Sequence, residues 1–324
     1  MSMTGFDPKW ATFPDYIIDI TREIWEGRGL STLRNYYAKD IIVRMAGGIS
    51  IGNDAVIAGT MATLAEFPDR ALLADDVVWC GTPEAGMLSS HRISCTATHA
   101  HDGLFGRATG RRVAFRAIAE CHARGGVIDD EWLARDQGAI CRQLSVDPEA
   151  FARSMIEHEG GGERASRPFT PDVDLTGPYR GSGNDDRWGV LYAEMLSAIM
   201  AADFTVIARD FDRACWLAYP DGVDARSHAP AEEFWIGLRA AFPSAEFSID
   251  HRIGNEDAMS GPRAAVRWSL RGKHEGWGRF GPPSGANVYI MGFSHADFGP
   301  RGLRSETVVF DTVAIWKQIL LHRG

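Results

Sequence analysis

Asp136 is the strongest candidate for a catalytic side chain in the first half of the chain. It lies in the strand-like run 127–138, where alternate side chains share a face, so we expect Trp132 and Asp136 on the same side. A carboxylate that faces inward between apolar walls loses solvation, and its pKa rises toward the range useful for proton transfer. We therefore predict Asp136 to face a pocket as a general acid or base. The alternative is that Asp136 caps a turn or pairs with an arginine such as Arg116.

Two polar residues on the preceding strand-like run, 108–123, could assist this carboxylate. Glu120 and His122 are two positions apart and share a face. A histidine near a carboxylate can carry its proton or polarise a carbonyl group. The alternative is that both residues lie at the exposed end of a hairpin, because Gly125 and Gly126 follow closely and mark a turn.

The chain repeats itself. When it is displaced by 175 residues, the segment from Phe67 to Leu144 shows 17 identities in 78 positions, where ordinary residue usage gives roughly 5. Residues 160–185 are rich in glycine and proline and indicate a linker. We therefore predict a first domain at 1–158, a linker at 159–185 and a second domain at 186–324.

The order of expected elements is the same in both domains. In the first domain, helical patterns at Tyr16–Trp25, Leu30–Ala38 and from an Asn53 cap to Glu66 surround a short strand at 41–45 and precede strands at 70–80, 87–99, 108–123 and 127–138. Asp147 and Pro148 predict the start of a further helix. In the second domain, helical patterns at 188–200, 204–211 and 231–242 precede strands at 245–253, 263–274, 286–297 and 303–315. Helices followed by antiparallel strands indicate an α+β fold.

Several motifs resemble those of a known family. The first domain has Phe-Pro-Asp at 67–69, the segment 91–132 with its Gly-Leu-Phe-Gly and Thr-Gly-Arg sequences, and Glu131-x-Trp-x-x-x-Asp136. These features resemble the SnoaL-like polyketide cyclases of the nuclear transport factor 2-like superfamily. The second domain keeps Phe-Pro and the Glu306 to Asp311 spacing but has Ser244 and Thr307 at the other positions, so it is divergent.

The resemblance implies two tandem cones, each a curved antiparallel sheet around helices with an apolar pocket at its open end. It also implies that the two domains form a pseudo-dimer within one chain; further homo-oligomers stay open. It places the acid/base aspartate at Asp136 and a pocket histidine at His122. The corresponding candidates in the second domain are Asp311, His295 and Asp297.

Aromatic side chains would line such pockets and bind flat, hydrophobic molecules. The alternative for each is plain core packing. The ligand-binding candidates are Trp25, Tyr36, Trp79, Trp132, Trp216, Trp235 and Trp268.

Other classes of function have little support. The net charge of −9 argues against nucleic acid and anionic membranes, and the five scattered cysteines suggest a reducing cytoplasm. The sequence shows neither a membrane span nor a signal peptide pattern. His99 and His101 could suit a metal, but Gly276 replaces the second histidine in the repeat, so we expect no metal. The GxGxxG pattern at 276–281 precedes prolines instead of a helix, so we expect no dinucleotide.

The sequence thus predicts binding of a small hydrophobic carbonyl compound, with cofactor-free acid/base chemistry such as cyclisation, isomerisation or dehydration by an isomerase or lyase. One alternative is a non-catalytic ligand-binding or scaffold protein with the same fold. Another is a hydrolase that activates a water molecule.

Overall fold

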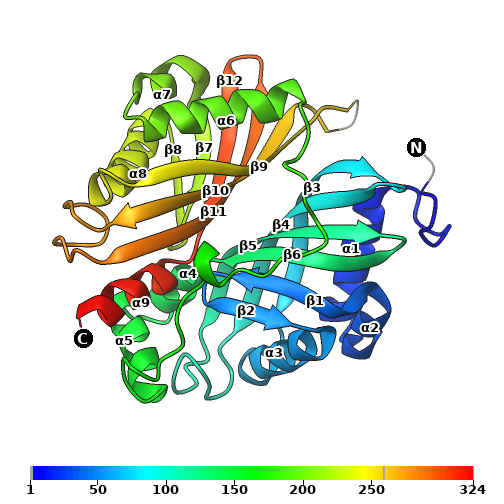
Figure 1. Cartoon of the computed structure of the whole chain (residues 1–324), viewed down its shortest axis with the longest axis horizontal. Helices are drawn as coiled ribbons and strands as arrows, with labels where there is room; N and C mark the ends of the chain where they lie inside the picture. Colours follow the sequence, from blue (N-terminus) through cyan, green and yellow to red (C-terminus); the bar gives the residue numbers. More distant parts are fainter. Residues whose placement is uncertain (1–2, 258–259, 324) are drawn as a thin grey trace.

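The computed structural model describes residues 3–257 and 260–323. It consists of two halves, and each half contains one six-stranded sheet and its own helices (Figure 1). The elements of the first half and the helix that follows it are α1 (Phe13–Thr21), η1 (Arg22–Glu26), η2 (Leu30–Thr32), α2 (Leu33–Tyr36), β1 (Tyr37–Met45), β2 (Gly48–Ile51), α3 (Asn53–Glu66), β3 (Ala71–Thr82), β4 (Gly86–Thr98), β5 (Arg112–Arg124), β6 (Val127–Arg135), α4 (Gln137–Gln143) and α5 (Pro148–His158). The remaining elements are η3 (Pro171–Val173), α6 (Arg187–Met200), α7 (Thr205–Asp210), β7 (Phe211–Tyr219), β8 (Val223–Arg226), α8 (His228–Ala241), β9 (Glu246–Asn255), β10 (Arg263–Lys273), β11 (Asn287–Gly299), β12 (Gly302–Val309) and α9 (Thr312–Arg323).

The two sheets have the same topology. The strand order is β2-β1-β6-β5-β4-β3 in the first half and β8-β7-β12-β11-β10-β9 in the second. The register repeats as well, since Glu120 pairs with Trp132 and, 175 positions later, His295 pairs with Thr307. The expected α+β fold with two repeated units is confirmed.

The sheets are mixed, which corrects the expectation of purely antiparallel strands. β1 runs parallel to β6, and β7 runs parallel to β12. This pairing joins the first long strand of each half to its last one, so that both lie side by side within an open six-stranded sheet. A short hairpin partner, β2 or β8, forms the outer edge.

Several local expectations also need correction. The helix expected at Leu30–Ala38 divides into η2 and α2, and β1 already begins at Tyr37. The cap residue of α3 is Gly52, while Asn53 is the first helical residue and donates a hydrogen bond to the Tyr37 carbonyl. The strand-like runs 127–138 and 303–315 end at Arg135 and Val309, because helices α4 and α9 begin directly afterwards. The predicted start of α5 at Asp147 and Pro148 is confirmed.

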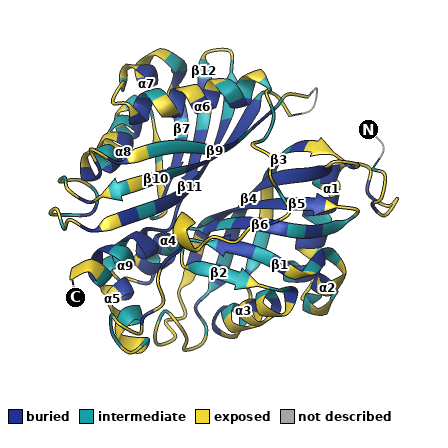
Figure 2. Cartoon of the chain, in the orientation of Figure 1, coloured by how far each residue is buried: buried dark blue, intermediate teal, exposed yellow. Residues whose placement is uncertain are grey.

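The helices cover the outer faces of the two sheets, and the inner faces pack against each other. In Figure 1, α1 and α3 lie on the face of the first sheet that is turned away from the second sheet. Likewise, α6 and α8 lie on the face of the second sheet that is turned away from the first. Buried residues, dark blue in Figure 2, follow the strands of both sheets. The space between the sheets contains an apolar cluster together with buried polar side chains. The apolar cluster comprises Val78, Cys80, Leu88, Ile118, Trp132, Ala134, Phe169, Ile253, Ala265, Met291, Phe293 and Val309.

The segment between α5 and α6 is irregular apart from η3. It nevertheless packs between the halves: Phe169 joins the core between the sheets, Asp174 accepts a hydrogen bond from Arg44, and the Tyr179 hydroxyl lies 2.7 Å from a ring nitrogen of His251. The segment therefore contributes to the interface of the pseudo-dimer.

Candidate functional site

The first half encloses a cavity between its sheet and its helices. The cavity has a volume of about 190 Å³ and is lined by α1, α3 and the helix-facing side of the sheet. Its walls are mostly apolar, with Ile17, Ile20, Val43, Val56, Ile93, Phe115, Ile128 and Leu133 among them. Such an enclosed, apolar space with a few polar groups is typical of small-molecule sites.

Glu131 on β6 is the carboxylate in this cavity. Its side chain is buried, and burial raises its pKa from 4.5 to about 7, although contacts with Tyr37 and Cys121 lower it. One carboxylate oxygen, Oε2, has no hydrogen-bond partner. A carboxyl group with a pKa near neutrality and a free oxygen is suited to accept or donate a proton.

His91 on β4 supplies a second polar atom to the same cavity. Burial lowers its pKa to about 4, so the ring is neutral at physiological pH. Its Nε2 atom is buried and has no hydrogen-bond partner. A neutral imidazole can donate or accept a hydrogen bond, depending on its tautomer, and it can polarise a carbonyl group.

Two arginines lie where this inner cavity meets an outer one. The outer cavity has a volume of about 460 Å³ and lies between α3, the loop 102–105 and the start of α4. Arg70 and Arg135 line both cavities. They bring positive charge to the wall that the two cavities share.

The structure corrects the expected placement of Asp136. Alternation along β6 does place Trp132 and Ala134 on one face, but this face packs against the second sheet, while Glu131, Leu133 and Arg135 line the cavity. Asp136 itself follows the strand and caps α4.

Its carboxylate is fully engaged at the interface between the halves. It accepts hydrogen bonds from the backbone N–H groups of Ala139 (3.0 Å), Asp221 (2.9 Å) and Gly222 (3.0 Å). Burial raises the pKa of Asp136 to about 7 in spite of these donors. Asp136 therefore acts as a helix cap, close to the alternative of a turn cap, and its hydrogen bonds to Asp221 and Gly222 connect the two halves.

Glu120 and His122 also lie on the face of the first sheet that packs against the second half. Arg267 of the second sheet donates to Glu120 over 2.8 Å, and His122 pairs with Asp129 at 2.6 Å. Neither residue lines the cavity. The expected polar cluster around Asp136 is therefore not assembled in a pocket.

The corresponding residues of the second half are at the same interface. Asp311 caps α9 and accepts a hydrogen bond from Gln137 over 2.5 Å. His295 lies 2.9 Å from the Ser90 hydroxyl of the first half, and Asp297 forms an ion pair of 3.6 Å with Arg92 of the first half. The structure thus shows buried polar contacts between the halves where the sequence predicted a second pocket.

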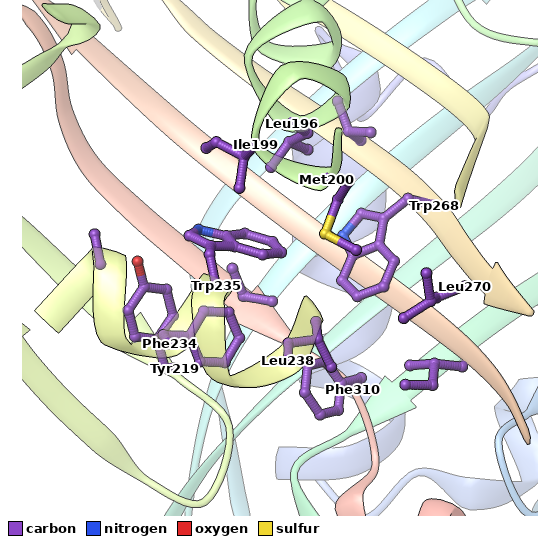
Figure 3. Packing of buried hydrophobic residues seen from close by; sticks show 14 of the residues in the cluster. Leu196, Ile199, Met200, Tyr219, Phe234, Trp235, Leu238, Trp268, Leu270 and Phe310 are labelled. Atoms are coloured by element: carbon purple, nitrogen blue, oxygen red, sulfur yellow. The ribbon is translucent and has the colours of Figure 1, made fainter. Parts of the chain in front are cut away.

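The cone of the second half is filled with side chains, as Figure 3 shows for the cluster around Trp235 and Trp268. Residues displaced by 175 positions explain the difference between the halves. Small or polar cavity residues of the first half correspond to large apolar ones in the second: Gly59 to Phe234, Thr60 to Trp235, Thr63 to Leu238 and Arg135 to Phe310. In addition, Ile93 corresponds to the larger Trp268. The expected ligand contacts of Trp235 and Trp268 are therefore corrected, since both are fully buried in a packed core.

Glu306, which corresponds to Glu131, shows the same contrast. It accepts hydrogen bonds from the hydroxyls of Tyr192 (2.9 Å) and Tyr219 (2.7 Å) and from the indole N–H of Trp235 (3.2 Å). Both of its oxygens are thus occupied, while Glu131 has a free oxygen that faces a cavity. The same residue type is structural in one half and available in the other.

The remaining aromatic candidates are distributed over several environments. Trp25 lines the cavity and donates to Thr60. Tyr36 donates to Glu23, and Trp79 packs edge-on against Phe13. Neither of these two lines the cavity, so they are not placed to contact a ligand there.

Two tryptophans form cation–π contacts away from the cavity. The Trp132 ring lies between the guanidinium groups of Arg44 (4.5 Å) and Arg267 (4.3 Å), at the interface of the two sheets. Trp216 contacts Arg116 of the other half. Both candidates therefore contribute to the interface between the halves.

The histidines considered for a metal have other partners. His99 lies between Glu66 and Thr109, at 3.1 Å from each, and His101 lies outside both cavities. Within residues 3–257 and 260–323, no three His, Cys, Asp or Glu side chains are arranged to hold a metal ion. No helix in the same ranges is long and apolar enough to cross a membrane.

Fold and cavity together define the first half as an α+β cone domain with a mostly apolar cavity between its sheet and its helices. The family model of the SnoaL-like polyketide cyclases matches residues 16–144, which contain every residue of both cavities. The chain therefore carries a SnoaL-like domain, and its second half repeats the fold. No curated protein matches the chain.

Solved structures similar to the chain each correspond to about two fifths of its length. IdmH from Streptomyces antibioticus is 22% identical with a TM-score of 0.36, and the match covers 41% of this chain and 98% of IdmH. A SnoaL-like polyketide cyclase from Agrobacterium tumefaciens is 18% identical with a TM-score of 0.35, over 42% of this chain and 99% of that one. TsrD from Streptomyces laurentii is 18% identical with a TM-score of 0.34, over 40% and 92%.

The sequence reasoning missed Glu131, His91, Arg70 and Arg135. Glu131 stands inside the motif that pointed to Asp136 and is identical in the repeat. Simple alternation groups Glu131 with Asp129, Leu133 and Arg135, which is a mostly charged set typical of an exposed face. A register shift in β6 brings the apolar Ile128 to the cavity instead of Asp129. Arg70 and His91 had no signal in the sequence, because the sheet and α3 must be in place before they meet.

Proposed function

We propose that the first domain binds a small hydrophobic ketone and transfers a proton at the carbon next to the carbonyl group, without a cofactor. Glu131 is the base in this proposal. Its free Oε2 removes the proton, the electron pair of the broken C–H bond forms an enolate, and the protonated Glu131 returns the proton. Return of the proton to another carbon gives isomerisation. Alternatively, the enolate carbon attacks a second carbonyl group, the C=O π bond of that group opens to an alkoxide, and the protonated Glu131 gives its proton to the alkoxide, which completes ring closure.

The single observation behind this proposal is the set of unsatisfied atoms in the cavity. Glu131 Oε2, His91 Nε2 and Arg70 Nε are buried without a hydrogen-bond partner within the described ranges, and all three residues line one apolar cavity. Buried polar atoms normally have partners, so a bound molecule is the natural source of the missing ones. In this proposal His91 stabilises the negative charge that develops on the carbonyl oxygen as the proton leaves.

For the second domain we propose a structural role. Its cone is packed with aromatic side chains, and the hydrogen bonds to Glu306 leave no carboxylate oxygen for a substrate. This domain then covers one face of the first sheet and stabilises it. The alternative of a non-catalytic scaffold thus applies to this half of the chain.

Deuterium exchange tests the chemistry without knowledge of the natural substrate. The full chain is incubated in D₂O with 1-tetralone, a bicyclic aryl ketone, and loss of the α-proton signal is followed by NMR. We expect Glu131→Gln to slow the protein-dependent exchange at least ~100-fold, the ordinary contribution of a general base.

Asp136→Asn is the matched control, because Asp136 is a buried carboxylate next to the same strand whose pKa is also raised. It should retain the exchange. Loss of exchange in Asp136→Asn with full exchange in Glu131→Gln would overturn the assignment. The same holds for the absence of any protein-dependent exchange with this ketone and with its open-chain analogue propiophenone.

A further inference from the structure

The wall that the two cavities share contains an unusual pair of cations. Five residues line both the inner and the outer cavity and define what we call the neck: Gly59, Thr63, Arg70, Phe115 and Arg135. Arg70 precedes β3, and Arg135 is the last residue of β6. The two guanidinium groups are close enough for Arg135 to lower the pKa of Arg70.

Arg70 is buried without any partner of opposite charge. Only 4% of the residue is exposed, its Nε atom has no hydrogen-bond partner, and no carboxylate of the described chain lies within 4 Å of its guanidinium or of that of Arg135. Burial is the main cause that lowers the pKa of Arg70 to about 10, and the positive charge of Arg135 adds to it.

Arg44 shows what a buried arginine in this chain otherwise looks like. It is 2% exposed and forms ion pairs of 2.5 Å with Asp130 and with Asp174. An unpaired buried cation lowers the stability of the fold, because the protein interior solvates a charge less well than water does. Arg70 therefore lacks a negative partner of the kind that Arg44 has, while Arg135 is close enough to Glu131 and Asp311 to lower the pKa of both carboxyl groups.

The fold itself does not require these arginines. The residues 175 positions later are Ala245 and Phe310, and both are buried in the packed core of the second half. The arginine pair thus occurs in the half whose cone holds a cavity between sheet and helices. In the second half the cone is filled, a pocket of about 380 Å³ lies beside α8, and apolar residues replace both arginines. This distribution links the pair to whatever the cavity holds.

We propose that the neck binds a carboxylate of the substrate, so that the substrates are hydrophobic keto acids. The idea rests on the proposed function and specifies its substrate class. The planar guanidinium matches the two oxygens of a carboxylate. A carboxylate carries a single charge, which is less costly to bring into a mostly apolar site than the double charge of a phosphate ester.

The geometry also limits the spacing within such a molecule. Glu131 and Arg135 lie on the same face of β6 four residues apart, which corresponds to about 13 Å along a strand. Their long side chains shorten this gap. A carboxylate at the neck then places a carbonyl group a few bonds away near Glu131 and His91, with the apolar end in the inner cavity.

Binding measurements with matched probes test this assignment. Isothermal titration calorimetry compares 4-oxo-4-phenylbutanoate, its methyl ester and 2-phenylethyl phosphate on the full chain. We expect the wild-type protein to bind the acid at least tenfold more tightly than the ester and than the phosphate. Arg70→Met should lose this preference, whereas Arg34→Met, which removes an exposed arginine paired with Asp54, should keep it.

A melting curve without ligand separates a binding role from a structural one. Arg70→Met removes an unpaired buried charge, so its melting temperature should equal or exceed that of the wild type. If this variant does not fold, Arg135→Gln takes its place in the titration. Equal affinity for acid and ester in the wild type, an unchanged preference in the arginine variants, or tighter binding of the phosphate would overturn the proposal.

The outcome is independent of the proposed chemistry. Glu131-dependent exchange of the neutral ketone 1-tetralone would stand if the carboxylate preference failed. A clear preference for the acid without exchange of any ketone would support the anion site and contradict the role of Glu131 as a base.

Discussion

Glu131→Gln should change how the stability of the protein depends on pH, and this prediction needs no substrate. Burial raises the pKa of Glu131 from 4.5 to about 7 in the folded state. Between these values the unfolded chain ionises Glu131 while the folded chain keeps it protonated. The contribution of this group to the free energy of unfolding therefore falls as the pH rises, by ~1.4 kcal/mol per unit of pKa difference and ~3 kcal/mol in total.

Urea denaturation followed by tryptophan fluorescence measures this effect at about pH 4.5 and pH 7.5. Burial also raises the pKa of Asp136 to about 7 and that of Asp311 to about 6, so part of the decline remains in the variant. The quantity to compare is therefore the difference between wild type and Glu131→Gln at each pH. We expect Glu131→Gln to gain ~3 kcal/mol relative to wild type over this range.

Glu306→Gln is the control for this experiment. The new amide would offer a single acceptor oxygen to the three donors that surround Glu306, so this variant should lose stability at both pH values. Equal pH slopes for wild type and Glu131→Gln would show that the folded state does not hold Glu131 protonated between these pH values. That result would refute both the burial argument and its use as a base poised near neutrality.

Three further predictions concern packing and the interface, and a fourth concerns the cavity. Asp136→Asn should lower the free energy of unfolding by ~1–3 kcal/mol, because the amide loses acceptor capacity for three backbone N–H groups; urea denaturation measures this. Arg44→Met leaves Asp130 buried without its cation and should cost ~3–5 kcal/mol in the same assay. Trp235→Ala should cost ~3–5 kcal/mol by opening a cavity in the second half. Thr60→Leu, which adds apolar volume at the corresponding position of the first half, should abolish binding of 1-tetralone in calorimetry, and unchanged binding would contradict the assigned cavity.

The repeat and the α+β class were predictable because they depend on local patterns and on identities at a fixed displacement. The parallel pairing of β1 with β6 was not, since it joins strands separated by most of the domain. The helices α4 and α9 were missed for a local reason. Thr312, Val313 and Ile315 continue the β-branched pattern of β12, and only the capping of α9 by Asp311 shows where the strand ends.

The strands that carry the candidate site could be predicted from the sequence, but the face of each strand that lines the cavity could not. The period of two correctly groups Trp132 with Ala134, but both faces of this sheet are buried. One face packs on helices and the other on the second sheet, so burial and polarity of a residue do not reveal which side it occupies. Glu120 was predicted to face the pocket, but it faces the second sheet, whereas Glu131 lines the cavity.

The two halves together show why a cavity is tolerated in this chain. An open cavity costs packing energy, and the second half repeats the same backbone with the space filled by Phe234, Trp235 and Trp268. The filled half also contributes Arg267 to Glu120 and the backbone N–H groups that bind Asp136. The second half therefore stabilises the face of the first sheet that packs against it. The opposite face, which lines the cavity, keeps buried polar groups without hydrogen-bond partners. On this argument, the residues that distinguish the halves, above all Arg70 and Arg135 against Ala245 and Phe310, mark the function more reliably than the identities that unite them.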